Sequence, residues 1–119
     1  MKIRDTMLPV LQPVGGDEEI KNLSESITSG WWGKGPKVAE FEKQFAKMVG
    51  AKYAVAVTSN TAGQDLVIKA LGLKGCDIIS PTMSFMTTAV VPLWNDCTST
   101  IVDVLDDTLC IDPEDVRRK

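Results

Sequence analysis

Two short polar stretches hold the residues that are best suited to bind an anion. The first is VTSNTAGQD, Val57 to Asp65, which places Ser59, Asn60 and Thr61 between an apolar run and a helical pattern. A helix that begins there presents free backbone N–H groups and a partial positive charge, and both attract phosphate. The segment is neither a Walker loop nor G-x-G-x-x-G, so any phosphate site would be a turn of small polar side chains.

The same residues also have a purely structural interpretation. Thr61-Ala62-Gly63-Gln64 matches the capping box, in which a threonine and a glutamine satisfy the free amides of their own helix. Spacing alone leaves capping and phosphate binding as two open alternatives.

A second stretch favours a ligand that joins a phosphate to a flat ring. Pro81-Thr82-Met83-Ser84-Phe85 follows the next predicted strand and brings hydroxyls and an aromatic ring to its carboxyl end. Ligands of open α/β sheets bind at that edge. A phosphorylated aromatic cofactor would suit both stretches, because its ring could stack on Phe85 while the helix end holds the charge. The alternative for Phe85 is a position in the core.

The surrounding pattern predicts an α/β fold. Strands are expected at Tyr53 to Val57, Cys76 to Ser80 and Thr100 to Val104, and the first two are apolar on consecutive residues, as in a sheet covered on both faces. Helices are expected between them, at Thr61 to Leu71 and Phe85 to Trp94. This alternation is typical of βαβ units in a parallel sheet.

Two amphipathic helices are expected before the first strand. One has Asp17 as its N-cap and ends at Gly30, and the other begins at Pro36 and ends at Gly50. Their apolar stripes are Ile20, Leu23 and Ile27 in the first, and Val38, Phe41, Phe45 and Met48 in the second. Pro92 should kink or shorten the last helix of the α/β part, and Trp94 is expected in the core.

Composition narrows the function classes. Thirteen basic and sixteen acidic residues in 119 give a net charge of −3 without a basic patch, so nucleic-acid binding is not expected. No apolar run is long enough to cross a membrane, and the first sixteen residues lack the core of a secretory signal. The chain has no histidine, which excludes a histidine-based triad or zinc site within it. Cys76, Cys97 and Cys110 are expected to be buried thiols in a reducing cytoplasm, with no metal or redox role.

From about Leu8 to Arg118 the chain resembles the N-terminal part of the DegT/DnrJ/StrS family of sugar aminotransferases. The matching runs, in family order, are GWWGKGPKVAEFEKQFAKMVGAKYAVAVTSNTAGQDLVIKALGL, IISPTMSFMTTA and IVDVLDDTLCIDPEDV. The family consists of pyridoxal-phosphate (PLP) enzymes of fold type I. Pro9, Pro13 and the Gly15-Gly16 pair predict an irregular N-terminal arm at residues 1–16. The resemblance implies an incomplete large PLP-binding domain at 17–119. Family members are much longer, and a helix start at Asp112-Pro113 close to the end also predicts a truncated copy.

The resemblance also implies the residues that bind the cofactor. The family's S-G-T-A phosphate turn falls on Ser59, Asn60, Thr61 and Ala62, with contacts from the backbone N–H groups and the Thr61 hydroxyl. The aromatic that stacks on the PLP ring, in the motif P-x-x-[ST]-[FWH], falls on Phe85.

Three positions depart from the family pattern. Asn60 replaces the commoner glycine, which asparagine tolerates because it accepts left-handed backbone angles. The usual G-D-E-V-I lead into the second strand appears as Gly75-Cys76-Asp77-Ile78-Ile79, with one residue fewer before it. Asp96 occupies a position that is usually glycine, so the turn before the third strand is expected to be strained.

The covalent machinery is not expected in this chain. Transamination needs a lysine that binds PLP covalently and moves a proton, and a carboxylate beside the pyridine nitrogen. In the family both follow the part that this chain matches, and none of its lysines occupies the family position. We therefore expect no catalytic residue here, and no activity from these residues alone.

By resemblance, the whole enzyme would convert a keto group of a nucleotide-linked sugar to an amino group in polysaccharide or secondary-metabolite biosynthesis. Glutamate would be the amino donor, and the enzyme a cytoplasmic homodimer. Trp31 and Trp32, in the loop GWWGKGP, either latch the following helix or line the nucleotide-sugar site. Two alternatives stay open: a PLP-dependent sugar dehydratase of the same family, and a non-catalytic regulatory or interaction module derived from it.

Overall fold

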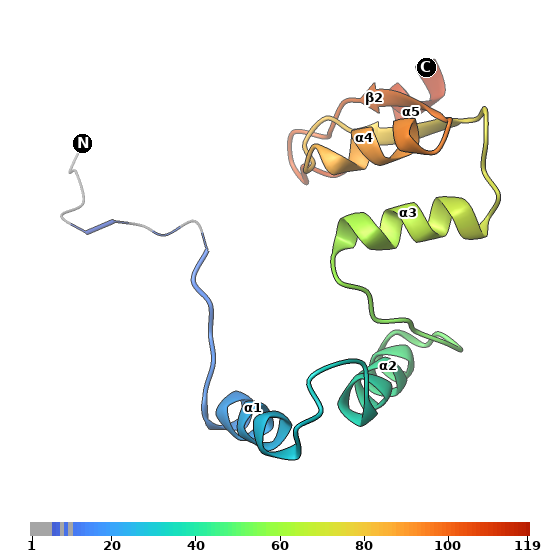
Figure 1. Ribbon diagram of the computed structural model, residues 1–119. Helices are drawn as coiled ribbons and strands as arrows, with labels where there is room; N and C mark the ends of the chain where they lie inside the picture. Colours follow the sequence, from blue (N-terminus) through green and yellow to red (C-terminus); the bar gives the residue numbers. More distant parts are fainter. Residues whose placement is uncertain (1–5, 8, 10) are drawn as a thin grey trace. The chain divides into compact units, whose positions relative to one another are not determined.

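The computed structural model describes residues 6, 7, 9 and 11–119. The elements run in the order α1 (Asp17–Ser29), α2 (Pro36–Val49), α3 (Asn60–Ala70), β1 (Asp77–Pro81), α4 (Thr87–Trp94), β2 (Thr98–Val102) and α5 (Pro113–Arg118) (Figure 1). They fall into two compact units, Met1–Ala56 and Val57–Lys119, which we call the N-terminal and the C-terminal unit. Of the arm predicted at residues 1–16, residues 1–5, 8 and 10 lie outside the described part. No helix among the described residues is long and apolar enough to span a membrane.

Helix α1 has Gly16 as its N-cap, so the prediction of Asp17 as the cap is wrong by one residue. Glu19 explains the shift, because its carboxylate accepts a 2.7 Å hydrogen bond from the Gly16 amide, as the glutamate of a capping box does. Asp17 instead takes the first helical position, where the helix dipole favours a negative charge. Gly30 follows the helix in a left-handed conformation with φ 70°, as predicted.

Helix α2 begins and ends where its local signals predict. Pro36 is its first residue, and Gly50 follows it with φ 70°. Ala46 is the buried residue of this helix. Phe41 and Phe45, from the predicted apolar stripe, contact each other with ring centroids 5.8 Å apart but remain exposed.

The C-terminal unit is built around two parallel strands joined through α4. Strands β1 and β2 pair in register from Asp77 with Thr98 to Pro81 with Val102. The strand predicted at Cys76 to Ser80 is thus found one residue later, and the one predicted at Thr100 to Val104 two residues earlier. The second shift arises because the amide of Asp103 donates to a carboxylate of α5 and leaves the ladder. The α/β class is confirmed.

The core of the C-terminal unit consists of Ile68 from α3, Val91 from α4 and Cys97 before β2, with Leu73, Cys76 and Ile78 packed against them. Helix α4 is short, as Pro92 predicted, and buries Val91 and Pro92. Trp94, its last residue, is 62% exposed, so its predicted core position is wrong. The prediction for the cysteines holds for Cys97 but is wrong for Cys110, which lies exposed in the turn after β2.

No strand forms at Tyr53 to Val57 in the described chain, so the prediction of a strand there is wrong. A strand needs a hydrogen-bonded neighbour, and β1 and β2 form a sheet of two strands. The Ala56 amide instead donates a 2.9 Å hydrogen bond to the carboxylate of Glu42. That bond, and a second from Lys34, hold the pKa of Glu42 below its usual value.

The turn before β2 is strained in the way the sequence predicts. Asp96 adopts φ 57°, a left-handed conformation that favours glycine. Its carbonyl accepts a 2.8 Å hydrogen bond from the amide of Gly75, which itself has φ 63°. This hydrogen bond holds the segment that leads into β1 beside the segment that leads into β2.

Candidate functional site

The turn that opens α3 is capped by Ser59. Its hydroxyl oxygen accepts a 3.1 Å hydrogen bond from the amide of Ala62, and its carbonyl accepts another from Gly63. The capping box predicted from Thr61 to Gln64 is therefore wrong. Thr61 is the second residue of the helix, and Gln64 donates to the Asn60 side chain at 2.6 Å instead.

This arrangement leaves hydrogen-bond donors free at the start of α3. Within the described residues, the amides of Asn60 and Thr61 and the hydroxyl of Thr61 make no hydrogen bond to another protein group. Asn60 has a helical backbone, so the left-handed angle that its glycine-like position suggested is not used. Adjacent donors at the positive end of a helix dipole match the oxygens of a phosphate.

A cavity of about 520 Å³ lies next to this turn within the C-terminal unit. Most of its surface is apolar, and its polar side chains are Asn60 and Gln64 from α3, Ser80 from β1 and Thr88 from α4. The lining is completed by Val57, Gly63, Val67, Ile68, Ile78, Ile79 and Pro92. Of the predicted phosphate residues Asn60 lines this cavity, whereas Ser59 and Thr61 do not. The fit to the phosphate end of PLP therefore rests on the free donors at the start of α3 and not on the cavity.

The loop after β1 is tied to α4 by hydroxyl groups that the sequence reasoning missed. Ser84 and Thr88 share a 2.9 Å hydrogen bond, and buried Ser80 donates to the Thr88 carbonyl at 3.4 Å. Ser84 lies in the bend before α4, so helical spacing could not have revealed this contact.

Phe85 lies in this loop, between β1 and α4, and its side chain is 75% exposed. Its carbonyl accepts a 2.9 Å hydrogen bond from the Thr88 amide. The ring does not line the 520 Å³ cavity. The structure therefore brings Ser59, Asn60 and Thr61 together and presents Phe85 as a free aromatic face after β1.

The N-terminal unit has its own cavity, of about 580 Å³, around the tryptophan loop. Trp31 and Trp32 both line it, yet their indole N–H groups are engaged, by the Lys34 carbonyl at 3.0 Å and the Ile27 carbonyl at 3.4 Å. Both side chains stay exposed, at 60% and 80%. The rings therefore offer their faces rather than their polar atoms.

Gly35 makes the position of the Trp31 ring possible. A Cβ atom at residue 35 would lie 2.1 Å from Trp31 Nε1, which no side chain could occupy. At Gly33 in the same loop, nothing lies within 4 Å of such an atom. Gly35 is therefore required by the close contact with Trp31, whereas Gly33 has room for a side chain.

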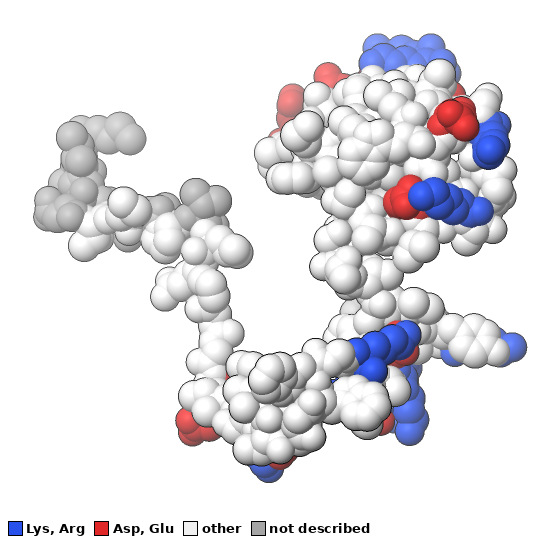
Figure 2. All heavy atoms as spheres, viewed as in Figure 1, with Lys and Arg blue, Asp and Glu red and all other residues white. Residues whose placement is uncertain are grey.

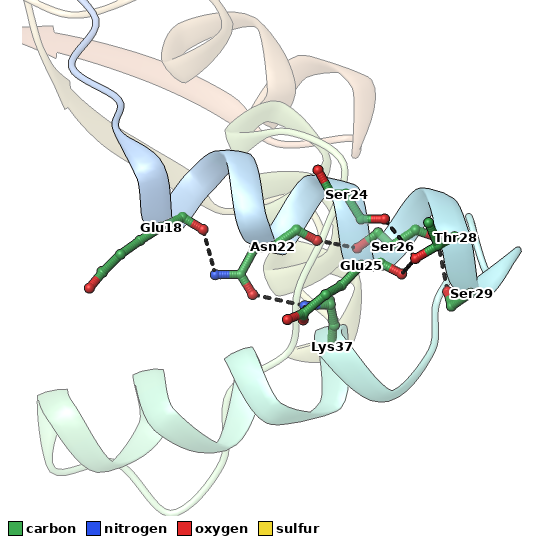
Figure 3. A network of polar contacts seen from close by, with 8 residues as sticks. All are labelled: Glu18, Asn22, Ser24, Glu25, Ser26, Thr28, Ser29 and Lys37. Atoms are coloured by element: carbon green, nitrogen blue, oxygen red, sulfur yellow. Dashed lines mark hydrogen bonds and ion pairs between the residues drawn. The ribbon is translucent and has the colours of Figure 1, made fainter.

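Charged side chains border the same cavity. Lys37 Nζ of α2 donates to Asn22 Oδ1 and Glu25 Oε2 of α1, both at 2.8 Å (Figure 3). The hydrogen bond and charge of Lys37 hold the pKa of Glu25 below its usual value. On the face shown in Figure 2, basic side chains are scattered among acidic and uncharged ones.

The α/β fold described above is shared with solved PLP-dependent enzymes that act on sugars. The chain belongs to the DegT/DnrJ/EryC1/StrS aminotransferase family, which it matches over residues 13–119. This match confirms the resemblance found in the sequence.

Relatives and solved structures agree with that assignment. The spore coat polysaccharide biosynthesis protein SpsC of Bacillus subtilis is 44% identical over 111 residues, which are 92% of this chain and 28% of that protein. GDP-4-keto-6-deoxy-D-mannose-3-dehydratase of E. coli, solved with bound hydrated PLP, has a TM-score of 0.84 at 32% identity, over 92% of this chain and 30% of that one. The aminotransferase TlmJ of Streptoalloteichus hindustanus has a TM-score of 0.81 at 30% identity, over 95% of this chain and 32% of that one.

These comparisons confirm the fold prediction and PLP as the cofactor of the family. The chain spans about three tenths of the length of the relatives it matches, with 28% of SpsC as the lowest of these three values.

Proposed function

We propose that this chain supplies the phosphate-binding part of a PLP-dependent enzyme that acts on a nucleotide-linked sugar. The reaction would convert a keto group of the sugar to an amino group, with glutamate as donor, in a cytoplasmic homodimer. Residues 17–119 would belong to the large PLP-binding domain, behind an arm at 1–16. The observation that carries this proposal is the start of α3, where the Asn60 and Thr61 amides have no protein acceptor in the described chain.

Each proposed cofactor residue has a distinct task. The Asn60 and Thr61 amides and the Thr61 hydroxyl donate to phosphate oxygens, while Ser59 holds the turn by accepting from Ala62. Phe85 offers an exposed ring for offset stacking, which orients a flat cofactor by about 0.5–1.5 kcal/mol beyond burial. Bound PLP supplies the electron sink that amino-group transfer needs. None of the lysines here is proposed as its covalent anchor.

The tryptophan loop is proposed to bind the nucleotide-sugar. Trp31 and Trp32 present ring faces to a 580 Å³ cavity, and ring faces stack on nucleobases and on the apolar faces of sugars. Because both indole N–H groups already donate to backbone carbonyls, binding would use stacking rather than indole hydrogen bonds.

A dehydratase acting on the same class of substrate is the second candidate. The observation that supports it is that the chain is as similar to the E. coli dehydratase, with a TM-score of 0.84 at 32% identity, as to the aminotransferase TlmJ, with 0.81 at 30%. In this reading Ser59, Asn60, Thr61 and Phe85 keep the same tasks, because both reactions use the same cofactor.

Cofactor binding is tested by titrating the purified protein with PLP and, in parallel, with pyridoxal, which has the ring but no phosphate. We expect PLP to bind at least tenfold more tightly, since charge-assisted hydrogen bonds would be missing from pyridoxal. Equal affinity would contradict a phosphate site at α3. Borohydride treatment followed by peptide mapping tests the claim that no lysine of this chain binds PLP covalently. A PLP adduct on one specific lysine of this chain would overturn that claim.

The two candidate reactions are separated by incubation with a nucleotide-linked keto-sugar and ¹⁵N-glutamate. An aminotransferase transfers the label to the sugar, whereas a dehydratase forms a sugar product that has lost water and carries no ¹⁵N. Mass spectrometry of the nucleotide-sugar distinguishes these outcomes. These residues alone are expected to give neither product, so the incubation uses the complete enzyme with PLP bound. Failure of both reactions in the complete enzyme would favour a non-catalytic module.

A further inference from the structure

Two thiols meet at the amino ends of the paired strands, whereas Phe85 follows the carboxyl end of β1. Cys76 immediately precedes β1 and Cys97 immediately precedes β2, and their Sγ atoms lie 3.5 Å apart. Cys97 is buried, whereas Cys76 is partly accessible. Neither residue has a task in the function proposed above.

The backbone holds the two cysteines opposite each other. On one side of the pair the Gly75 amide donates to the Asp96 carbonyl at 2.8 Å, and on the other the Thr98 amide donates to the Cys76 carbonyl at 2.9 Å. Neighbouring strands lie about 4.8 Å apart, which is within the Cα separations that disulfides span. To form the bond, the sulfur atoms approach from 3.5 Å to a bond length of about 2.05 Å.

We propose that Cys76 and Cys97 form a reversible redox pair, which a hydroperoxide converts to a disulfide between the amino ends of β1 and β2. The more accessible Cys76 sulfur attacks the peroxide, so that the O–O bond breaks, an S–O bond forms, and water leaves from hydrogen peroxide or an alcohol from an organic hydroperoxide. The Cys97 sulfur then displaces that oxygen as water, and the S–S bond forms. The two sulfurs together lose two electrons, which reduce one peroxide, and a dithiol reductant reverses the change.

The geometry also predicts how the reaction responds to pH. A hydrogen bond with Cys97, together with burial, raises the pKa of the Cys76 thiol, and the nearby Asp77 acts in the same direction. Because the thiolate is the nucleophile, oxidation should be slow at pH 7 and accelerate as the pH rises towards and beyond the ordinary thiol range.

The disulfide would leave the cofactor residues untouched. It would close a loop that contains β1 and α4, but at the end of the strands opposite to Ser84 and Phe85. We therefore expect the affinity for PLP to be unchanged by oxidation, so this proposal stands or falls separately from the proposed function.

The test compares disulfide formation in folded and unfolded protein. Purified reduced protein is treated with hydrogen peroxide, blocked with N-ethylmaleimide and cleaved before Asp77, Asp96 and Asp103, which separates the three cysteines. In the folded protein we expect the Cys76–Cys97 crosslink to dominate, Cys110 to remain open to alkylation or to oxidise separately, and dithiothreitol to restore both thiols.

The same treatment in denaturant is the control. In an unfolded chain the shorter loop closes more readily, so Cys97–Cys110 should exceed Cys76–Cys97 by about twofold. A folded sample with that same distribution, or one in which Cys76 proceeds to sulfinic acid while Cys97 stays reduced, would overturn the proposal. In the Cys110→Ser variant the crosslink should form as in the parent, and in Cys97→Ala it should be abolished.

Discussion

The side-chain amide of Asn95 donates a 2.8 Å hydrogen bond to the carboxylate of Asp65 and so links α4 to α3. The same Nδ2 donates to the Val91 carbonyl at 3.0 Å, and Asn95 is buried. The bonds from Lys69 and Asn95 hold the pKa of Asp65 below its usual value. The helix that opens at the proposed phosphate turn is thus fixed to its neighbour by a polar contact as well as by apolar packing.

Removing this link should destabilise the protein. We expect Asn95→Ala to lower the free energy of unfolding by about 1–3 kcal/mol, because it deletes a buried hydrogen bond to a charged group. Urea unfolding of the purified protein measures the change. The control is Asn22→Ala, at an exposed asparagine of α1, which should shift the unfolding free energy by no more than about 0.5 kcal/mol. Equal effects of the two changes would show that the link contributes nothing.

Loss of the Thr61 hydroxyl should weaken PLP binding specifically. In Thr61→Val one donor to the phosphate is removed while the side-chain volume is kept, and a hydrogen bond to a charged group corresponds to about a tenfold or greater rise in Kd. Titration with PLP and with pyridoxal measures this, and the affinity for pyridoxal should not change. Thr87→Val is the matched control, because Thr87 is also a half-buried threonine in the first turn of a helix. A Kd for PLP that Thr61→Val leaves unchanged would remove that hydroxyl from the site.

A methyl group at residue 35 should displace the Trp31 ring. Gly35→Ala would place its Cβ within 2.1 Å of Trp31 Nε1, so the indole must leave the Lys34 carbonyl. The expected result is a shifted tryptophan emission and, if the loop binds the nucleotide-sugar, at least a several-fold loss of affinity by calorimetry.

Gly33→Ala serves as the control for that change, since nothing would meet its methyl group. Emission and affinity should both stay at their parent values. Identical effects of the two substitutions would indicate that any added side chain perturbs the loop, and the packing of Trp31 against Gly35 would lose its importance.

Asp115 should make stability depend on pH in acid. Its Oδ2 accepts a 2.7 Å hydrogen bond from the Asp103 amide, and this bond, with the charges of Lys119 and Arg118, holds the pKa of Asp115 below its usual value. A lowered pKa means that the ionised form stabilises the fold at pH values above the unfolded-state pKa of about 3.9, and that this contribution is lost as the pH falls through the folded-state value.

The measurement is the urea midpoint of the parent and of Asp115→Asn as a function of pH. The parent should be the more stable by a constant margin above about pH 5, and the two should converge below about pH 4. Glu114→Gln, at an exposed neighbouring carboxylate, is the control and should show no such convergence. If the parent stayed more stable than Asp115→Asn by the same margin below pH 4, the charge of Asp115 would not contribute to stability.

Local signals in the sequence were enough to place the helices. Pro36 and Gly50 set the limits of α2, and Asp112 caps α5 by accepting from the Glu114 amide, as expected. These predictions succeed because the groups that begin or end a helix lie within a few residues of it. The cap at Ser59 was missed for a related reason, since Ser59 and Thr61 both had the right chemistry and only the backbone path chose between them.

The remaining errors concern contacts between distant residues. The strand at Tyr53 to Val57 depended on a hydrogen-bonded neighbour that periodicity cannot reveal. The approach of Cys76 to Cys97 follows from the register of β1 and β2, two strands that come from residues 21 positions apart in the chain. The candidate phosphate residues were identified because they are contiguous. The partners that hold the loop around Phe85, Ser80 and Thr88 among them, became visible only with the fold.

The left-handed conformation of Asp96 before β2 also suggests how the thermal stability of this protein could be increased. Asp96 carries a side chain at a backbone angle that costs most L-amino acids about 1–2 kcal/mol, and among the described residues its one hydrogen bond is the one its carbonyl accepts from the Gly75 amide. A glycine at this position would keep that hydrogen bond and relieve the crowding at Cβ. In a random library selected for survival at elevated temperature, we expect glycine at position 96 to be enriched among the surviving clones.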